Sequence, residues 1–299
     1  MIEDVFVLQV PFRGTYRLQR IRFGQGRPRL VVVAGLHGNE LNGIHAVHLL
    51  ASALREQRPI GTVDLLPLVN VFGIEDGTKR GPFEGEDLNE VFPGHPLGTA
   101  MQRVAYAVLE ATDADVCVDV HSGSPLVQEM PQVRLPLAGP EVDLGRATGL
   151  PFVWRRPTGG REPSGLVGAW RALGRRGFRI TGGRGGSLDP RDSVAMANGV
   201  RRLMAALGMG SNVGPGETLV DVTHDEITAH RCETGGFFVP ESRVGMRVLP
   251  GHLLGRVLDP VGGEVLETVR ADRAGLVTNL RVYPMVHAEE LLVRVAALR

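Results

Sequence analysis

The chain has 299 residues, 43% of them hydrophobic, which allows a sizeable core and excludes a disordered chain. Its 33 basic and 33 acidic residues give a formal net charge of zero without a basic stripe, so we expect no nucleic-acid partner. We expect no signal peptide and no membrane span. Because Cys117 and Cys232 form no disulfide or metal spacing, we expect a cytoplasmic setting.

The first third of the chain predicts an alternation of strands and helices. Residues 1–30 alternate between apolar and polar and contain Gly and Pro breaks, which predicts an antiparallel edge hairpin. The β-branched run at 31–34, closed by Gly35, is typical of a buried parallel strand. A helix over about 41–55 and a strand over 63–69 follow.

His37 and Glu40 stand just past that first parallel strand, in the run GLHGNE. The carboxyl ends of strands in open α/β sheets usually carry the ligand sites, and imidazole and carboxylate both suit zinc. This motif alone leaves a plainer alternative open, in which Glu40 caps a helix and His37 is an ordinary loop residue.

Residues 71–98 have no clean period and are expected to form a long loop, of the kind that is usually functional or disordered. Its apolar residues predict that it packs against the domain. A helix over 99–110 and a strand over 116–120 follow, and that strand runs directly into His121. Two nearby ligands and one distant ligand at another strand end can build a zinc site with an open position. Asp119 points to the same face as His121, either to orient it or as a buried structural residue.

The last third changes character after Met209. The segment 210–217 is predicted to be a linker, and short strands separated by Gly, Pro and Asp turns predict a small all-β barrel or sandwich. We therefore divide the chain into domains at 1–210 and 211–299. His45 and His48 are interpreted as residues of a helix surface or of packing, and four histidines of the last third as structural; these four are His224, His230, His252 and His287.

Several motifs together resemble the succinylglutamate desuccinylase/aspartoacylase family of zinc-carboxypeptidase-like hydrolases. The motifs are GLHGNELNG, GTKRGPFEGEDLNEVFPG, VDVHSGS, PSGLVGAWRALGRRGF, GGSLDPRDSVAMANGVRRLMAALGM, GGFFVP and RVYPMVHAEELLVRVA. The resemblance implies an α/β fold with a mixed sheet, followed by a small barrel-sandwich hybrid. It also implies one Zn²⁺ per chain, held by His37, Glu40 and His121, and cleavage of N-acyl amino acids or related amides.

The chain departs from the family pattern at the position that usually binds a substrate carboxylate. The family's D-L-N-R reads Asp87-Leu88-Asn89-Glu90 here, so Asn89 is retained but an arginine is replaced by Glu90. Lys79 or Arg80 could still bind an anion. In one interpretation, the substrate lacks the usual carboxylate at this place or carries a cationic amine. In the other, Glu90 turns outward and a neighbouring arginine substitutes.

The second departure concerns the general base. The family places a glutamate at a strand end, and Thr181 stands at or beside that position here. Thr cannot accept a proton at neutral pH, and the loss of a positioned base costs about 10²–10⁴ in rate. Glu233 or Glu129 could substitute, and nothing in the sequence selects one.

We expect a zinc-dependent deacylase that acts on a small acylated amine or amino acid. The alternative is a metal-binding protein of the same fold that has lost catalysis and binds a ligand or partner; a peptidase is disfavoured. The second domain contains no lysine, because Lys79 is the only one in the chain, so carrier chemistry is excluded. A lid, a wall or a homo-oligomer contact remains as its role.

Overall fold

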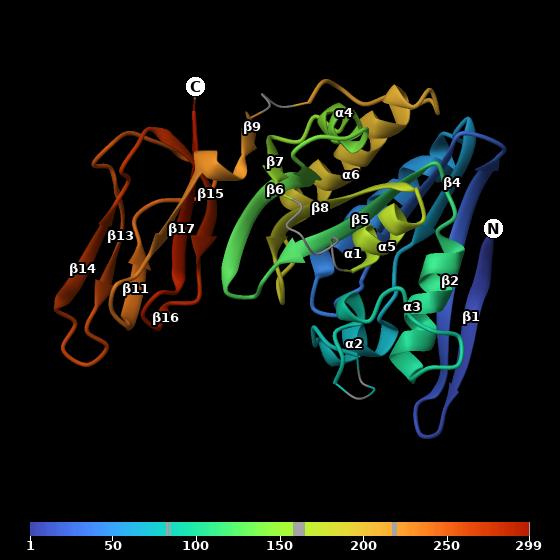
Figure 1. Ribbon diagram of the computed structural model, residues 1–299, viewed down its shortest axis with the longest axis horizontal. Coiled ribbons are helices and arrows are strands. Elements are labelled where there is room, and N and C mark those ends of the chain that lie inside the picture. The colour runs from blue at the N-terminus through green and yellow to red at the C-terminus, as the bar shows by residue number, and fades with distance from the viewer. Residues whose placement is uncertain (82, 84, 158–164, 217–219, 299) are drawn as a thin grey trace.

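The computed structural model describes residues 1–81, 83, 85–157, 165–216 and 220–298 (Figure 1). These residues form a mixed sheet of 13 strands and a second sheet of four. The larger sheet consists of β1 (Ile2–Val10), β2 (Gly14–Gln25), β3 (Arg29–Ala34), β4 (Gly61–Leu66), β5 (Val116–Gly123), β6 (Val127–Pro136), β7 (Phe152–Arg156), β8 (Arg176–Arg184), β9 (Val220–Thr223), β10 (Ile227–Arg231), β12 (Arg247–Val248), β15 (Gly275–Arg281) and β17 (Leu291–Ala297). The helices are α1 (Leu41–Glu56), α2 (Val71–Asp76), α3 (Ala100–Ala111), α4 (Glu141–Ala147), α5 (Leu166–Ala172) and α6 (Pro190–Ala206), with short 3₁₀ turns η1 (Leu88–Glu90) and η2 (His224–Glu226).

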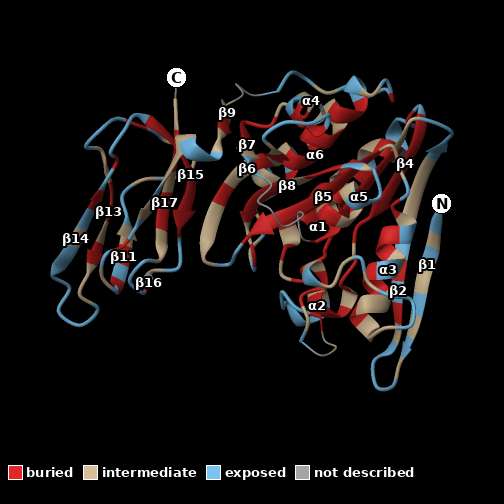
Figure 2. Ribbon diagram, viewed as in Figure 1, coloured by how far each residue is buried: buried red, intermediate tan, exposed pale blue. Residues whose placement is uncertain are grey.

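The order of the strands confirms the predicted edge hairpin and the parallel centre. β1 and β2 pair antiparallel at one end of the sheet, and β2 joins it through β4. β3 pairs in parallel with β4 and β5, and β5 with β8. Figure 2 shows that these central strands are buried along their length, as their β-branched sequences predict.

Helices cover both faces of this sheet (Figure 1). Apolar side chains of α1 and α6 form one core with Val118, Val120 and Ile180. Side chains of α3 and α5 form a second core with Val31 and Cys117 on the other face. With both faces covered, the carboxyl edge of the parallel strands is left for a site.

The segment 71–98 is more regular than a loop, which corrects the prediction. The chain leaves β4 at Leu66, and α2 begins directly after Asn70, whose side chain accepts a hydrogen bond from the Gly73 N–H. Gly77 ends α2 in the left-handed conformation. A helix of six residues between two such signals is too short to display an apolar period, so only its capping residues could have revealed it.

The C-terminal region is rich in strands, as predicted. Its second sheet contains β11 (Gly236–Pro240), β13 (Leu253–Leu258), β14 (Val265–Arg270) and β16 (Met285–Val286), and its side chains pack in a core of their own. The larger sheet continues across residue 210, because β9 pairs with β7 and β15 with β6. A division into domains at this residue stays a prediction. Thr218 and Leu219, which the sequence places in a strand, lie outside the described residues. Within the described chain, no helix is long and apolar enough to cross a membrane.

Candidate metal centre

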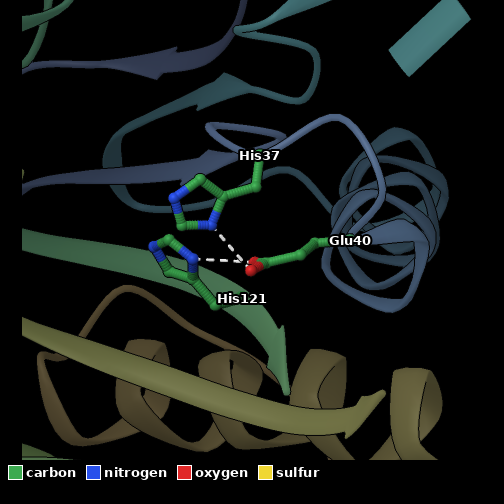
Figure 3. Close-up of side chains that lie close together, drawn as sticks. All are labelled: His37, Glu40 and His121. Atoms are coloured by element: carbon green, nitrogen blue, oxygen red, sulfur yellow. Dashed lines mark hydrogen bonds and ion pairs between the residues drawn. The ribbon is translucent and has the colours of Figure 1, made fainter. Parts of the chain in front are cut away.

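His37, Glu40 and His121 converge at the carboxyl edge of the sheet (Figure 3). His37 Nδ1 lies 2.7 Å from Glu40 Oε1, and His121 Nδ1 lies 2.7 Å from Glu40 Oε2. The side chains come from the loop after β3, the start of α1 and the end of β5. One potential ligand atom from each residue lies within 4.8 Å of the others. The three predicted metal ligands therefore share one site.

The backbone between β3 and α1 explains how two of these side chains meet. Gly35 adopts a φ of +71°, which an L side chain rarely adopts, and starts the turn. A Cβ atom at Gly38 would lie 1.9 Å from the backbone of Gly73, so only glycine allows the loop to approach α2 this closely. Glu40 occupies the N-cap of α1 but its side chain makes no capping hydrogen bond. The plainer alternative for Glu40 is therefore wrong, because its carboxylate contacts imidazoles instead.

The outer nitrogen of each imidazole faces a second carboxylate. His37 Nε2 lies 3.0 Å from Asp87 Oδ1, and His121 Nε2 lies 2.7 Å from Asp119 Oδ2. Asp119 is fully buried and is bound in turn by Arg179, 3.1 Å away. A carboxylate that accepts a hydrogen bond from Nε2, as Asp87 does from His37, fixes the ring orientation and frees Nδ1 to ligate a metal. Asp119 and His121 Nε2, by contrast, form an ion pair without hydrogen-bond geometry. Of the two interpretations of Asp119, the orienting one fits this geometry.

Charge and burial act against each other in this cluster. Burial lowers the pKa of His37, but hydrogen bonds and charges of Asp87 and Glu40 outweigh it and raise that pKa to about 9. Burial raises the pKa of Glu40, but His121 and His37 outweigh it and hold the pKa of the carboxyl well below its usual range. In the absence of an ion, the carboxylates thus favour a positively charged group between them.

The donor set fits a small divalent cation. Two imidazole nitrogens and one carboxylate are the ligands of many catalytic zinc sites, which keep a further position open. Glu40 is only 8% exposed. Among the described residues it contacts no lysine or arginine; its partners are the two imidazoles and the Ser122 N–H. A buried carboxylate of this kind needs a positively charged partner. Both imidazole rings are oriented so that their nitrogens could supply the remaining protein ligands of a metal ion.

The predicted substrate-binding residues lie beside this cluster in different environments. Lys79 Nζ contacts Asp87 Oδ2 at 2.7 Å, and Arg80 is exposed and donates to the Gly85 carbonyl. Asn89 Oδ1 accepts a hydrogen bond from the Leu166 N–H at the start of α5. Glu90 is exposed, in agreement with the outward alternative. Substrate contacts by these four residues stay predictions.

The candidate general bases lie in different surroundings. Thr181 is buried on β8, in register with His121 on β5 and with Gln132 on β6. Glu129, on β6, is 8% exposed, and its Oε2 accepts hydrogen bonds from Gln132 and Arg134. Glu233 is exposed in the C-terminal region, where its N–H binds Glu267.

One group near the site was missed by the sequence analysis. Trp154 on β7 is 1% exposed and stacks on His224, with ring centroids 5.7 Å apart. Three arginine guanidinium groups contact the same ring. The only local signal is the run Trp154-Arg155-Arg156, because the other contributors come from distant strands.

Comparison with known proteins settles the family. A model of the succinylglutamate desuccinylase/aspartoacylase catalytic domain matches residues 26–207. The chain belongs to this family. One relative, N-alpha-acetyl-L-2,4-diaminobutyric acid deacetylase of Halomonas elongata, is 32% identical over 113 residues. The match covers 37% of this chain and 33% of that protein, so it spans about a third of the relative's length.

Solved structures agree with the family's fold over the whole chain. The product-bound ectoine utilization protein EutE (DoeB) of Ruegeria pomeroyi has a TM-score of 0.83 at 23% identity, covering 100% of this chain and 95% of that one. A succinylglutamate desuccinylase of Silicibacter sp. has a TM-score of 0.81 at 21% identity, covering 99% and 95%. These likenesses establish a mixed α/β fold with the β-rich C-terminal region included.

Proposed function

We propose that this family member is a zinc-dependent amidohydrolase that removes the acyl group from an N-acyl amino acid or a related small acylated amine. The observation that carries the proposal is the convergence of His37, Glu40 and His121. Both imidazoles turn Nδ1 toward one carboxylate while Asp87 and Asp119 hold the outer nitrogens. The zinc-carboxypeptidase-like character of the fold belongs to the same proposal.

His37, Glu40 and His121 would hold one zinc ion. When bound, the ion would supply Lewis-acid chemistry, that is, polarisation of an amide carbonyl and a lowered pKa of water. The chain's own contribution is orientation: Asp87 and Asp119 fix the two rings.

Glu129 is our candidate for the proton acceptor that Thr181 cannot be. A Cβ at Gly123 would lie 2.7 Å from Glu129 Cγ, so this side chain occupies the space beside the second residue after His121. Its Oε2 binds Gln132, which lies opposite Thr181. Within the described part of the chain, Oε1 forms no hydrogen bond and could take a proton from the attacking water. The carboxylate would thus reach the site from β6 instead of β8.

The substrate class follows from the family and from one relative. That relative's name describes a deacetylase of an acylated diamino acid. We therefore propose an acylated amino acid, with or without a second amine, as the substrate. The cytoplasmic setting and a homo-oligomer stay predictions.

A second function is favoured by one observation, namely Thr181 at the expected base position. A protein with zinc but without turnover would bind a ligand or partner instead. Metal analysis of the purified protein, followed by N-acetyl, N-succinyl and N-acyl diamine substrates, separates the two. Stoichiometric zinc with hydrolysis of any of these supports the enzyme; stoichiometric zinc without hydrolysis supports the binding protein. A protein that takes up no zinc contradicts both.

A further inference from the structure

Three arginines from separate strands surround Trp154. The guanidinium carbons of Arg156 on β7, Arg294 on β17 and Arg134 on β6 lie 4.8, 5.2 and 5.5 Å from the centroid of its indole ring. We call Arg134, Arg156 and Arg294 the basic cluster. Arg294 comes from the C-terminal region and the other two from the catalytic domain, so both parts of the chain are needed to build it.

The basic cluster has more positive charge than the described residues neutralise. Glu129 pairs with Arg134. Neither Arg156 nor Arg294 forms a hydrogen bond or ion pair through its side chain in the part of the chain that the structure describes. Arg156 is exposed as a whole residue, but partial desolvation of its guanidinium group lowers its pKa, and the charges of Arg134 and Arg179 lower it further against the opposing charge of Glu129. Burial likewise lowers the pKa of Arg294, although Glu129 opposes the shift. Guanidinium groups crowded in this way favour an added anion.

Buried hydrogen-bond donors at the same place also lack acceptors. Trp154 Nε1 has no partner although the side chain is 1% exposed. Arg134 Nε is buried and has no partner either. Buried donors in native proteins are normally satisfied. An anion seated against the basic cluster would supply acceptors for groups that the described protein leaves unpaired.

A row of residues in register connects this place with the metal centre. Asp119 on β5 pairs with Arg179 on β8. Arg179 pairs in turn with Arg134 on β6, and Arg134 pairs with Trp154 on β7. Asp119 contacts His121, a proposed ligand. Neighbouring strands are about 4.8 Å apart, so the row spans about 14 Å. An anionic group at the basic cluster would lie at a distance that fits the far end of an elongated substrate whose amide lies at the metal centre.

We propose that the basic cluster is a carboxylate-binding subsite, which selects an elongated N-acyl amino acid with a carboxylate at the end remote from the scissile amide. This inference rests on the proposed function for its link to hydrolysis. A carboxylate suits the site because it accepts two parallel hydrogen bonds from one guanidinium fork. It also offers further lone pairs to a neighbouring donor. The site supplies the anion recognition that the 87–90 loop lacks where Glu90 replaces an arginine, and it gives the C-terminal region a role as a wall.

The test measures binding separately from turnover. Succinate, glutarate, acetate and inorganic phosphate are titrated calorimetrically into the full-length protein, both zinc-loaded and stripped with a neutral chelator. We expect saturable binding of the dicarboxylates in both forms, weaker binding of acetate, and about 10–100-fold weaker dicarboxylate binding in R156Q and R294Q. R156K and R294K should recover part of the affinity, because lysine restores charge without the fork.

R270Q is the matched control, because Arg270 is exposed on β14 and donates only to the Gly251 carbonyl. It should bind as the wild type does. Circular dichroism verifies that each variant is folded; Arg156 is exposed, so its variants test the inference even if R294Q does not fold. Dicarboxylate binding that disappears with zinc, or that R156Q leaves unchanged, overturns the subsite. Phosphate bound as tightly as glutarate overturns the carboxylate assignment.

The same variants separate this inference from the proposed function. If the protein hydrolyses a dicarboxylic acyl amino acid, R156Q should raise KM with little change in kcat. Hydrolysis with an unchanged KM removes the subsite and keeps the enzyme. Dicarboxylate binding without hydrolysis of any substrate removes the enzyme and keeps the subsite.

Discussion

The metal centre and the basic cluster differ in how their charges are satisfied. At the metal centre, each imidazole nitrogen faces a carboxylate, and each outer carboxylate is bound by Lys79 or Arg179. At the basic cluster, all three guanidinium groups contact an indole ring, but among the described residues only that of Arg134 pairs with a carboxylate. The first region is preorganised for a cation, and the second has charge left for an anion. If both proposals hold, the first region fixes a cofactor and the second binds a ligand that arrives and departs.

Removing a proposed metal ligand tests the first half of this comparison and should have the largest effect. We expect H121N to lose stoichiometric zinc and roughly 10³-fold or more in hydrolysis, because several kcal/mol of transition-state stabilisation are lost with the ion. H48N is the matched control, since His48 is exposed on α1. Zinc content by mass spectrometry and rates on the best substrate provide the measurement. Full zinc occupancy in H121N would contradict the assignment.

The proposed proton acceptor links the two regions, because Glu129 lies beside Gly123 and also pairs with Arg134. E129Q keeps a side chain that can accept a hydrogen bond but not a proton at neutral pH. We expect kcat to fall about 10²–10⁴-fold while zinc content stays at the wild-type level, and the acidic limb of the pH–rate profile to change.

E233Q is the control for Glu129, since Glu233 is exposed in the C-terminal region, where its N–H donates to Glu267. If E129Q retains wild-type kcat and pH profile, Glu129 is not the base. An equal loss in E233Q would point to the other candidate.

The outer carboxylates are expected to matter less than the ligands they orient. In D119N the His121 ring keeps a neighbour but loses the charge opposite Nε2. We expect zinc affinity to fall about 10–100-fold, measured by competition with a chromogenic chelator. D143N changes an aspartate that is 91% exposed and should leave affinity unchanged. Wild-type affinity in D119N would mean that Asp119 serves Arg179 and the core instead.

The sequence predicted the metal centre far better than the basic cluster, for a physical reason. His37 and Glu40 lie three residues apart after a recognisable strand, and His121 ends another parallel strand. The topology of a parallel sheet therefore brings them to one edge. The basic cluster depends on pairing of β6 with β7 and of β15 with β6, and on the packing of Arg294 against Trp154. None of these contacts leaves a local pattern, because pairing partners of distant strands are set by the whole fold.

The same reasoning explains the misjudged elements. α2 is too short for a period, and Asn70 and Gly77 were its only signals. The continuity of the larger sheet beyond residue 210 was hidden because a linker-like composition does not reveal which strands pair later. The sequence named Glu129 and Glu233 as substitutes for Thr181 but selected neither, because only the register of β6 against β8 places Glu129 opposite Gly183, two residues after Thr181.

Asp192 offers the smallest and most selective test, because this half-buried carboxyl has neither an imidazole nor an arginine as partner. Burial and the charge of Asp189 raise the pKa of Asp192 from 3.8 to about 6, against an opposing hydrogen bond from Gln128. The folded state thus holds this proton more tightly than the unfolded chain does. Its contribution to stability is complete below about pH 4 and is lost as the pH rises through 6.

D192N removes that loss, so the variant should gain about 1–2 kcal/mol of unfolding free energy over the wild type between pH 4 and pH 7. This range discounts the shift for partial exposure and for the favourable place of a negative charge in the first turn of α6. Urea denaturation at both pH values measures it, with D143N as the exposed control. A D192N effect that is equal at pH 4 and pH 7 would show that Asp192 titrates normally. In that case the surroundings of Asp192 between β6 and α6 are more hydrated than its partial burial indicates.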